Sequence, residues 1–245
     1  MALDKQSFTS VLTKVFRENG MGNLLSKDAA EKLFLLTERM TGENEKYNLT
    51  AITEPKKVIL HHYADCATLA RLLPKGASVI DVGCGAGFPT LPLAILRPDL
   101  RITAMDSTAK RVNYVAESAA LLSLDGVRAI TMRAEDGGRD GALREKFDFA
   151  TARAVAEMRI LAELCLPFVR VGGKFIAMKG KNAEFELSTA KKALSMLGGR
   201  NTVCEEISLK GEDETLTHPL IIVEKKEKTP AAYPRPYAQI SKKPL

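Results

Sequence analysis

The amino-acid sequence predicts a doubly wound α/β fold with a mostly parallel sheet, preceded by a lobe of helices. From about residue 75 onward, short runs of branched apolar residues alternate with stretches of helical spacing, as strands joined by helices do. The first run, residues 79–82, leads into three alternating glycines within residues 83–87. The second run, residues 101–106, ends on an acid about 20 residues beyond the glycines. We therefore expect a Rossmann-like nucleotide site at the ends of these two strands.

The glycine loop indicates which cofactor this site takes. Glycine adopts positive φ readily and lets a ligand approach the backbone, and the helix predicted directly after the loop offers free N–H groups. Gly83, Gly85 and Gly87 form a G-x-G-x-G pattern, with Phe88 where a dinucleotide-binding loop has its third glycine. The spacing favours S-adenosylmethionine (SAM), with Asp106 on the ribose hydroxyls, as in class I methyltransferases. The alternative is that the glycines only form a tight turn and Asp106 caps the next helix.

Length and composition limit the remaining possibilities. The 245 residues suit a helical lobe at 1–74, a SAM-binding core at 75–225 and a basic, proline-containing tail at 226–245. No apolar run has transmembrane length and the start lacks a signal-peptide pattern, so a cytoplasmic protein is expected. The four cysteines form no C-x-x-C pair and the three histidines have no ligand spacing, so neither disulfides nor a metal site is expected.

Apolar residues recur at helical spacing in the first part of the chain. This pattern predicts helices over residues 4–19, 26–43 and 55–73. The stretch 47–52 interrupts it and contains Asn48, which suits either a helix cap or a contact to a base.

In the core, the strands are predicted at residues 79–82, 101–106, 127–132, 147–152 and 174–179, followed by two candidate strands, 202–209 and 220–224, that form an antiparallel edge. Ligands lie beyond the carboxyl ends of the strands in such a sheet, so residues that follow different strands share one rim. The predicted rim residues are Gly83, Gly85, Gly87, Phe88, Asp106, Ala134, Glu135, Arg153 and Lys179.

Several motifs along the chain together resemble one known family. They are the segments 47–50, His62-x-x-Asp65, 81–89, Asp106-Ser107 with Lys110-Arg111, Arg153-Ala154, Lys179-Gly180, 233–235 and 242–245. Over nearly the whole chain they are similar to the bacterial 16S ribosomal RNA guanine-N7 methyltransferases known as RsmG or GidB. The resemblance implies SAM-dependent methylation of the decoding-region guanosine conventionally numbered 527, with 16S rRNA or the small ribosomal subunit as partner. It also implies cofactor contacts at Gly83, Phe88, Ala134, Glu135 and Arg153, with Asp106 near the ribose.

Such a reaction needs no general base, because guanine N7 carries a lone pair and no proton, so catalysis consists mainly of alignment. The sequence agrees: residues 151–154 lack the Asn/Asp-Pro-Pro-Tyr/Phe stretch of exocyclic-amine methyltransferases. The substrate-positioning candidates are Asn48, His62, Asp65, Arg153 and Lys179. His62 and Asp65 either orient RNA or pair with each other. Arg153 either contacts a ligand or neutralises a carboxylate, and Lys179 either reaches phosphate or caps the rim.

The tail carries most of the net charge. The formal net charge of the whole chain is +6. Residues 225–245 contain six basic residues and one acidic residue, which gives this segment a net charge of +5. Its prolines predict an extended segment without a helix, acting as an arm on RNA phosphates. The alternative is a strap that packs on the domain through Tyr233, Tyr237, Ile240 and Leu245.

Three other functions remain open at this stage. A small-molecule methyltransferase would share the SAM site, but the basic tail would then have no role. A dinucleotide-dependent oxidoreductase is disfavoured by Phe88. A non-catalytic RNA-binding module on the same fold would bind RNA without turnover. For the rRNA methyltransferase, a monomer that does not bind a membrane is expected.

Overall fold

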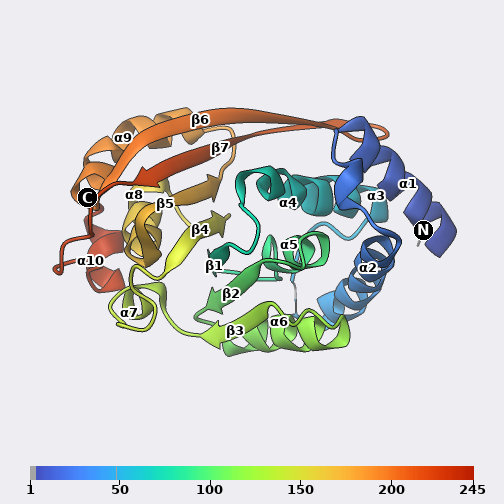
Figure 1. Ribbon diagram of the computed structural model, residues 1–245, viewed down its shortest axis with the longest axis horizontal. Coiled ribbons are helices and arrows are strands. Elements are labelled where there is room, and N and C mark those ends of the chain that lie inside the picture. Colours follow the sequence, from blue (N-terminus) through green and yellow to red (C-terminus); the bar gives the residue numbers. More distant parts are fainter. Residues whose placement is uncertain (1–3, 48) are drawn as a thin grey trace.

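The computed structural model describes residues 4–47 and 49–245. Its centre is a seven-stranded sheet in the order β3-β2-β1-β4-β5-β7-β6, which confirms the predicted fold class (Figure 1). Neighbours among β1 to β5 pair in parallel, and β7 pairs antiparallel with both β5 and β6, as expected for the edge. The strands are Ser78–Val82 (β1), Arg101–Asp106 (β2), Val127–Thr131 (β3), Phe147–Arg153 (β4), Val169–Met178 (β5), Gly199–Lys210 (β6) and Thr215–Lys225 (β7).

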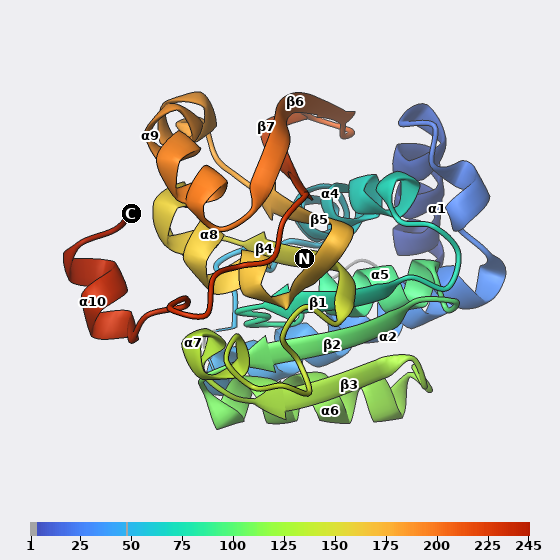
Figure 2. The ribbon, with the colours of Figure 1, turned by 60° about the vertical axis from the view of Figure 1, so that its left-hand side comes forward.

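Helices cover both faces of the sheet because successive strand residues point to opposite sides. Val79 belongs to a core shared with the N-terminal helices, whereas its neighbour Ile80 belongs to a core shared with the C-terminal ones (Figure 2). The first face carries α2 (Lys27–Tyr47), α5 (Thr90–Leu96) and α6 (Ala109–Leu121), and the second carries α8 (Met158–Cys165) and α9 (Ala183–Met196). No helix within residues 4–47 and 49–245 is both long and apolar enough to span a bilayer.

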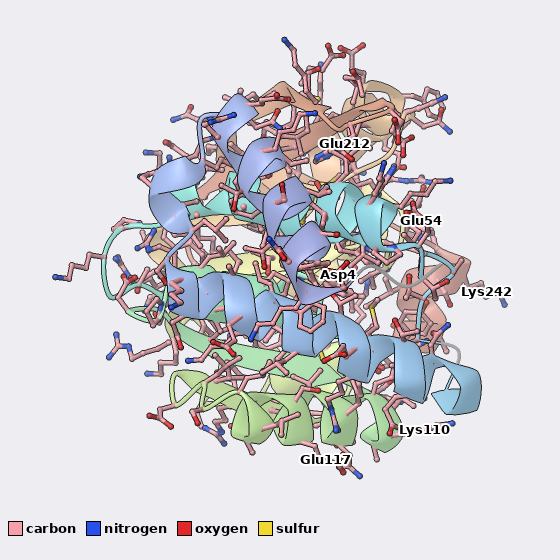
Figure 3. The ribbon with its side chains drawn as sticks, turned by 90° about the vertical axis from the view of Figure 1, so that its right-hand side faces the viewer. Asp4, Glu54, Lys110, Glu117, Glu212 and Lys242 are labelled. Atoms are coloured by element: carbon pink, nitrogen blue, oxygen red, sulfur yellow. The ribbon has the colours of Figure 1, made fainter. Side chains whose placement is uncertain are left out.

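The helical lobe begins with α1 (Lys5–Glu18), which lies across α2 (Figure 3). Asp4 caps α1 by accepting the backbone N–H of Ser7 at 2.9 Å. The buried face of α1 consists of the apolar residues that the spacing predicts: Phe8, Leu12, Val15 and Phe16. Helix α2 continues to Tyr47, past the predicted end at residue 43. The interior Gly42 did not stop it, because a helical glycine costs only about 1 kcal/mol and the packing of α2 outweighs this.

The predicted third helix contains a wide turn that its spacing did not reveal. The segment consists of α3 (Pro55–Val58), the π-helical turn η2 (Ile59–Ala64), α4 (Asp65–Ala67) and the 3₁₀ turn η3 (Thr68–Leu72). A π-helical turn rotates the following side chains relative to a regular helix, and such turns are frequent at functional sites. Two of the predicted site residues, His62 and Asp65, lie in and directly after this turn.

Strands β6 and β7 form a hairpin longer than predicted, which reaches the helical lobe. At its turn, Glu212 lies 3.3 Å from Lys14 Nζ and 3.0 Å from Lys56 Nζ (Figure 3). Asn19, which ends α1, exchanges two hydrogen bonds of 2.8 Å with the backbone of Lys210. The hairpin therefore connects the sheet edge to the lobe.

The C-terminal strap, residues 229–245, packs on the domain and ends in a helix, which corrects the expectation of an extended arm. Helix α10 (Tyr237–Lys242) begins directly after Pro236, at a position where a missing N–H leaves no helical hydrogen bond unmade. Ile240 is fully buried, and Arg235 pairs with the buried Glu163 at 2.7 Å. Just before the strap, Lys225 is also fully buried, and burial lowers its pKa to about 8. Lys225 and Arg235, two of the six basic residues expected to contact RNA, are therefore engaged in contacts inside the protein.

We predict that Arg235→Ala lowers the free energy of unfolding by about 3–5 kcal/mol, because it leaves the buried Glu163 carboxylate without its cation. Deletion of residues 229–245 should likewise lower the melting temperature (Tm). Urea and thermal unfolding measure both effects. Lys243→Ala, an exposed change in the same segment, is the matched control and should move stability by less than about 0.5 kcal/mol. Wild-type stability of the deletion variant, with a shallower salt dependence of RNA binding, would instead support the arm.

Candidate active site

A cavity of about 540 Å³ opens at the carboxyl ends of β1, β2 and β4, beside the point where the strand order reverses. Ligands are expected at this position in a doubly wound sheet. The predicted residues on its wall are His62, Gly83, Gly85, Phe88, Asp106, Ala134, Glu135 and Arg153. Of the other predicted residues that the structure describes, Gly87, Asp65 and Lys179 lie outside the wall. Asn48 falls outside the described residues, although its neighbour Leu49 lines the cavity.

The three loop glycines have different roles. All have positive φ, +77° at Gly83, +52° at Gly85 and +85° at Gly87. A Cβ at Gly83 would lie 2.7 Å from Val155, and one at Gly87 would lie 2.6 Å from Leu91, so these two positions are filled by packing. A Cβ at Gly85 would meet nothing closer than a backbone oxygen at 3.9 Å. Gly85 lines the cavity, so it is the glycine that leaves room for a ligand.

Asp106 holds the loop and the next helix together while facing the cavity. Its Oδ2 accepts the N–H of Gly85 at 3.1 Å, and its Oδ1 accepts the N–H of Thr108, directly before α6, at 2.9 Å. The capping alternative is thus part of its role. A carboxylate offers about four lone-pair sites, so Asp106 keeps acceptor capacity for ligand hydroxyls.

The wall has the chemistry that SAM requires. The carboxylates of Asp106 and Glu135, 5% and 9% exposed, can accept hydrogen bonds from ribose hydroxyls and an amino group. Ala134 and Leu164 supply apolar surface for a flat base. Gly85 leaves space against the backbone. A cavity of about 540 Å³ also falls in the usual range for small ligands, roughly 300–1,000 Å³. The residues present therefore fit this cofactor.

Arg153 joins the cavity wall to the helical lobe. Its Nη1 lies 3.0 Å from Asp65 Oδ2, and its Nη2 donates to the His61 carbonyl oxygen at 3.0 Å. The same Nη2 lies 2.9 Å from Nδ1 of His62. His62 and Asp65 therefore meet through Arg153 rather than by pairing with each other. Arg153 neutralises a carboxylate, which is one of the two predicted alternatives, and it also lines the cavity.

His62 is held in its neutral form. Nδ1 of His62 lies 2.9 Å from Arg153 Nη2 and 3.1 Å from the His61 carbonyl oxygen, and Nε2 lies 3.1 Å from Thr50 Oγ1. Burial, assisted by the charge of Arg153, lowers the pKa of His62 to about 3. The ring stacks on Phe88 with centroids 4.1 Å apart and planes inclined by 20°. The stack places a flat, uncharged surface at the cavity wall.

The family follows from comparison with known proteins. Residues 29–216 match the model of the GidB family, described as rRNA small subunit methyltransferase G. Two proteins of that name are similar to this chain. The one from Clostridium perfringens strain 13 is 44% identical over 93% of this chain and 95% of its own. The one from Lactobacillus delbrueckii subsp. bulgaricus is 48% identical over 82% of this chain and 85% of its own.

The chain belongs to the GidB family. Solved structures of lower identity show the same fold. An O-methyltransferase from Thermotoga maritima described as SAM-dependent matches with a TM-score of 0.51 at 16% identity, covering 78% of this chain and 72% of that one. P. horikoshii TYW2 in complex with MeSAdo matches with a TM-score of 0.53 at 16% identity, covering 67% and 62%. The predicted class I methyltransferase fold is thereby confirmed.

This GidB-family site includes a residue that sequence reasoning missed. His218 of β7 has its Nε2 2.5 Å from Asp65 Oδ1, so Asp65 lies between His218 and Arg153. The sequence did not place His218 at the site, because this strand was predicted to begin at residue 220, whereas it begins at Thr215. Tyr237 of α10 and the exposed Arg111 also line the cavity without having been predicted there.

The side chain of Lys179 is engaged by other residues of the protein. Its Nζ donates to the Ala156 carbonyl oxygen at 2.8 Å and pairs with Glu186 at 2.6 Å, and the side chain is 9% exposed. This geometry favours the interpretation in which Lys179 caps the rim over a contact with phosphate.

We predict that Gly85→Ala abolishes measurable binding of S-adenosylhomocysteine while the protein remains folded, because the added methyl enters ligand space. Gly76→Ala is the matched control: Gly76 has φ +73° and open space, but lies outside the cavity wall. Both changes carry the same left-handed strain, about 1 kcal/mol. Calorimetry should show loss of binding only for Gly85→Ala. Equal affinities in the two variants would move the cofactor away from this loop.

We further predict that His62 makes the protein less stable in acid. Its pKa is about 3 when folded and 6.5 ordinarily, so the unfolded chain binds the proton more tightly. The free energy of unfolding contributed by neutral His62 is complete above pH 6.5 and is lost as the pH falls toward 3. Urea unfolding of His62→Gln between these limits should show a flatter pH dependence than wild type. His61→Gln is the control, because the His61 ring contacts Glu214 near the surface. Identical slopes for His62→Gln and wild type would contradict the buried neutral state.

Proposed function

We propose that this chain transfers a methyl group from SAM to N7 of a guanosine in 16S ribosomal RNA, the decoding-region guanosine numbered 527. The main support is the cavity at the point where the strand order reverses, which is lined by Gly85, Asp106, Glu135 and Arg153. The chain also belongs to the GidB family. When bound, SAM supplies an electrophilic methyl group on a sulfonium. Methyl transfer would take place in the cytoplasm, and the protein would act as a monomer on 16S rRNA or the small ribosomal subunit.

The chain's own residues would bind and orient the cofactor. The loop backbone at Gly85 leaves space for it, while Asp106 and Glu135 accept its hydrogen bonds. Phe88, stacked on His62, forms a flat wall that excludes water. With the donor fixed in this way, the rate gain comes from holding the acceptor nitrogen in line with the methyl group.

The titratable groups around Arg153 are arranged for positioning and not for proton transfer. His62 turns Nδ1 toward Arg153, and Asp65 contacts both Arg153 and His218. Of these residues His62 lines the cavity, and burial lowers its pKa to about 3, so its ring is a weak base. This suits N7 as the acceptor, because its lone pair attacks without a general base.

The cavity mouth also suits a polyanionic acceptor. Arg111 and Arg133 line the cavity with side chains 55% and 62% exposed. Each lies only loosely against a carboxylate, at 3.6 Å from Asp106 and 3.8 Å from Glu135. Guanidinium groups at such a rim attract RNA phosphates through charge and released counterions.

The deciding experiment identifies the product. The protein is incubated with methyl-labelled SAM and with either naked 16S rRNA or small subunits from a strain that lacks this modification. Nuclease digestion and mass spectrometry should find 7-methylguanosine in the decoding-region fragment of at least one substrate. Label on another nucleoside would indicate a different RNA methyltransferase. RNA binding without label would indicate a non-catalytic module, and either result would overturn the proposal.

We predict that Asp106→Ala weakens S-adenosylhomocysteine binding by about 1–3 kcal/mol, the usual cost of an unpaired hydrogen-bonding group. RNA affinity should change little, because the Asp106 side chain is 5% exposed. Calorimetry and filter binding give the two affinities. Arg133→Ala is the converse control, expected to weaken RNA binding with little effect on the cofactor. Equal losses of both affinities in Asp106→Ala would make Asp106 a purely structural cap.

A further inference from the structure

The C-terminal strap approaches the cavity because it is anchored on both sides of it. On α8, Glu163 is fully buried and accepts hydrogen bonds from the backbone N–H of Arg235, at 2.7 Å, and from its guanidinium. Near the end of α7 (Ala134–Gly137), Arg139 donates to the Pro234 carbonyl oxygen at 2.7 Å. The chain thus crosses from α7 to α8 within residues 234–235.

Helix α10 is fixed immediately after this crossing. Ile240 is fully buried in the core that contains α8 and α9. Figure 2 shows α10 packed beside α8. Two anchors, Arg235 before the helix and Ile240 within it, therefore leave little freedom to the residues between them.

Tyr237 lies between these anchors and is one of the residues that line the cavity. It shares the cavity with Ala134 and Glu135 of α7 and with Leu164 of α8. The residue is 41% exposed, although Ile240 on the same short helix is fully buried. A ring fixed by buried neighbours but left open toward a cavity is available for a flat ligand.

The neighbouring residues indicate which ligand group the ring meets. Glu135 accepts hydrogen bonds, as an exocyclic amino group requires, while Ala134 and Leu164 are apolar. Elsewhere on the cavity wall lie Arg153 and the stacked rings of His62 and Phe88. A purine with an amino group fits between α7, α8 and Tyr237, because stacking on an aromatic ring suits any base face.

We propose that Tyr237 completes the cofactor site, its ring stacking on the adenine of SAM at the end of the cavity formed by α7 and α8. This inference rests on the proposed function, since it assumes that the cavity binds SAM. It assigns the C-terminal strap to the cofactor and not to the RNA backbone. The strap then links cofactor affinity to the integrity of the last residues of the chain.

The test measures binding in the full-length protein. Calorimetry with S-adenosylhomocysteine should show roughly tenfold weaker binding for Tyr237→Ala, the loss expected from one stacked base. Tyr237→Phe keeps the ring and should bind like wild type. Adenosine used as a competitor should lose affinity by the same factor in Tyr237→Ala, because the lost contact is to adenine.

Two controls separate stacking from packing. Gln239→Ala, an exposed change on the same helix, should leave affinity and Tm unchanged. Ile240→Ala should lower Tm, whereas Tyr237→Ala should not, because Ile240 alone of the two is buried.

Four outcomes would overturn the inference: unchanged affinity in Tyr237→Ala, an equal loss in Tyr237→Phe, an adenosine affinity that Tyr237→Ala leaves unchanged, or a loss of RNA binding with cofactor affinity intact. The last would assign the ring to the acceptor base. Failure of the wild-type protein to bind S-adenosylhomocysteine would instead overturn the proposed function itself, so the two failures are distinguishable.

Discussion

The ion pair between the buried Asp65 and the partly buried Arg153 is the interaction on which the arrangement of the site depends. Arg153 ends β4 where the strand order reverses, and Asp65 begins α4 in the helical lobe. His218, from the antiparallel hairpin, contacts the second carboxylate oxygen of Asp65. Three parts of the chain that are distant in sequence therefore meet at one carboxylate beside the cavity.

This interaction imposes conditions on its surroundings, because buried charges are stable only when their remaining hydrogen-bonding groups are also paired. The wide turn η2 meets this requirement by presenting the His61 carbonyl oxygen and Nδ1 of His62 to the guanidinium. His62 must then stay neutral, and its uncharged ring can stack on Phe88 at the wall. The position of the His62–Phe88 stack on the cavity wall thus depends on the neutral state of His62 and on the ion pair between Arg153 and Asp65.

Local patterns in the sequence predicted the sheet, the glycine loop and eight of the residues that line the cavity. The G-x-G-x-G spacing and Asp106 suffice because adjacent parallel strands bring their carboxyl ends together. His218 escaped prediction because β7 extends beyond its apolar run, to Thr215, through pairing with β6. The strap was predicted only as the alternative to an extended arm. Proline and charge content favoured the arm, whereas burial of Ile240 and pairing of Arg235 are tertiary contacts that such content does not reveal.

The most direct test of this account replaces Arg153 by leucine and measures stability and cofactor affinity together. Loss of the guanidinium leaves Asp65 with His218 alone, so the free energy of unfolding should fall by about 3 kcal/mol, and S-adenosylhomocysteine should bind more weakly because the wall is released. Arg111→Leu, at the exposed rim, should leave the stability unchanged. A loss of affinity in Arg153→Leu at wild-type stability would reduce Arg153 to a simple ligand contact and contradict the account.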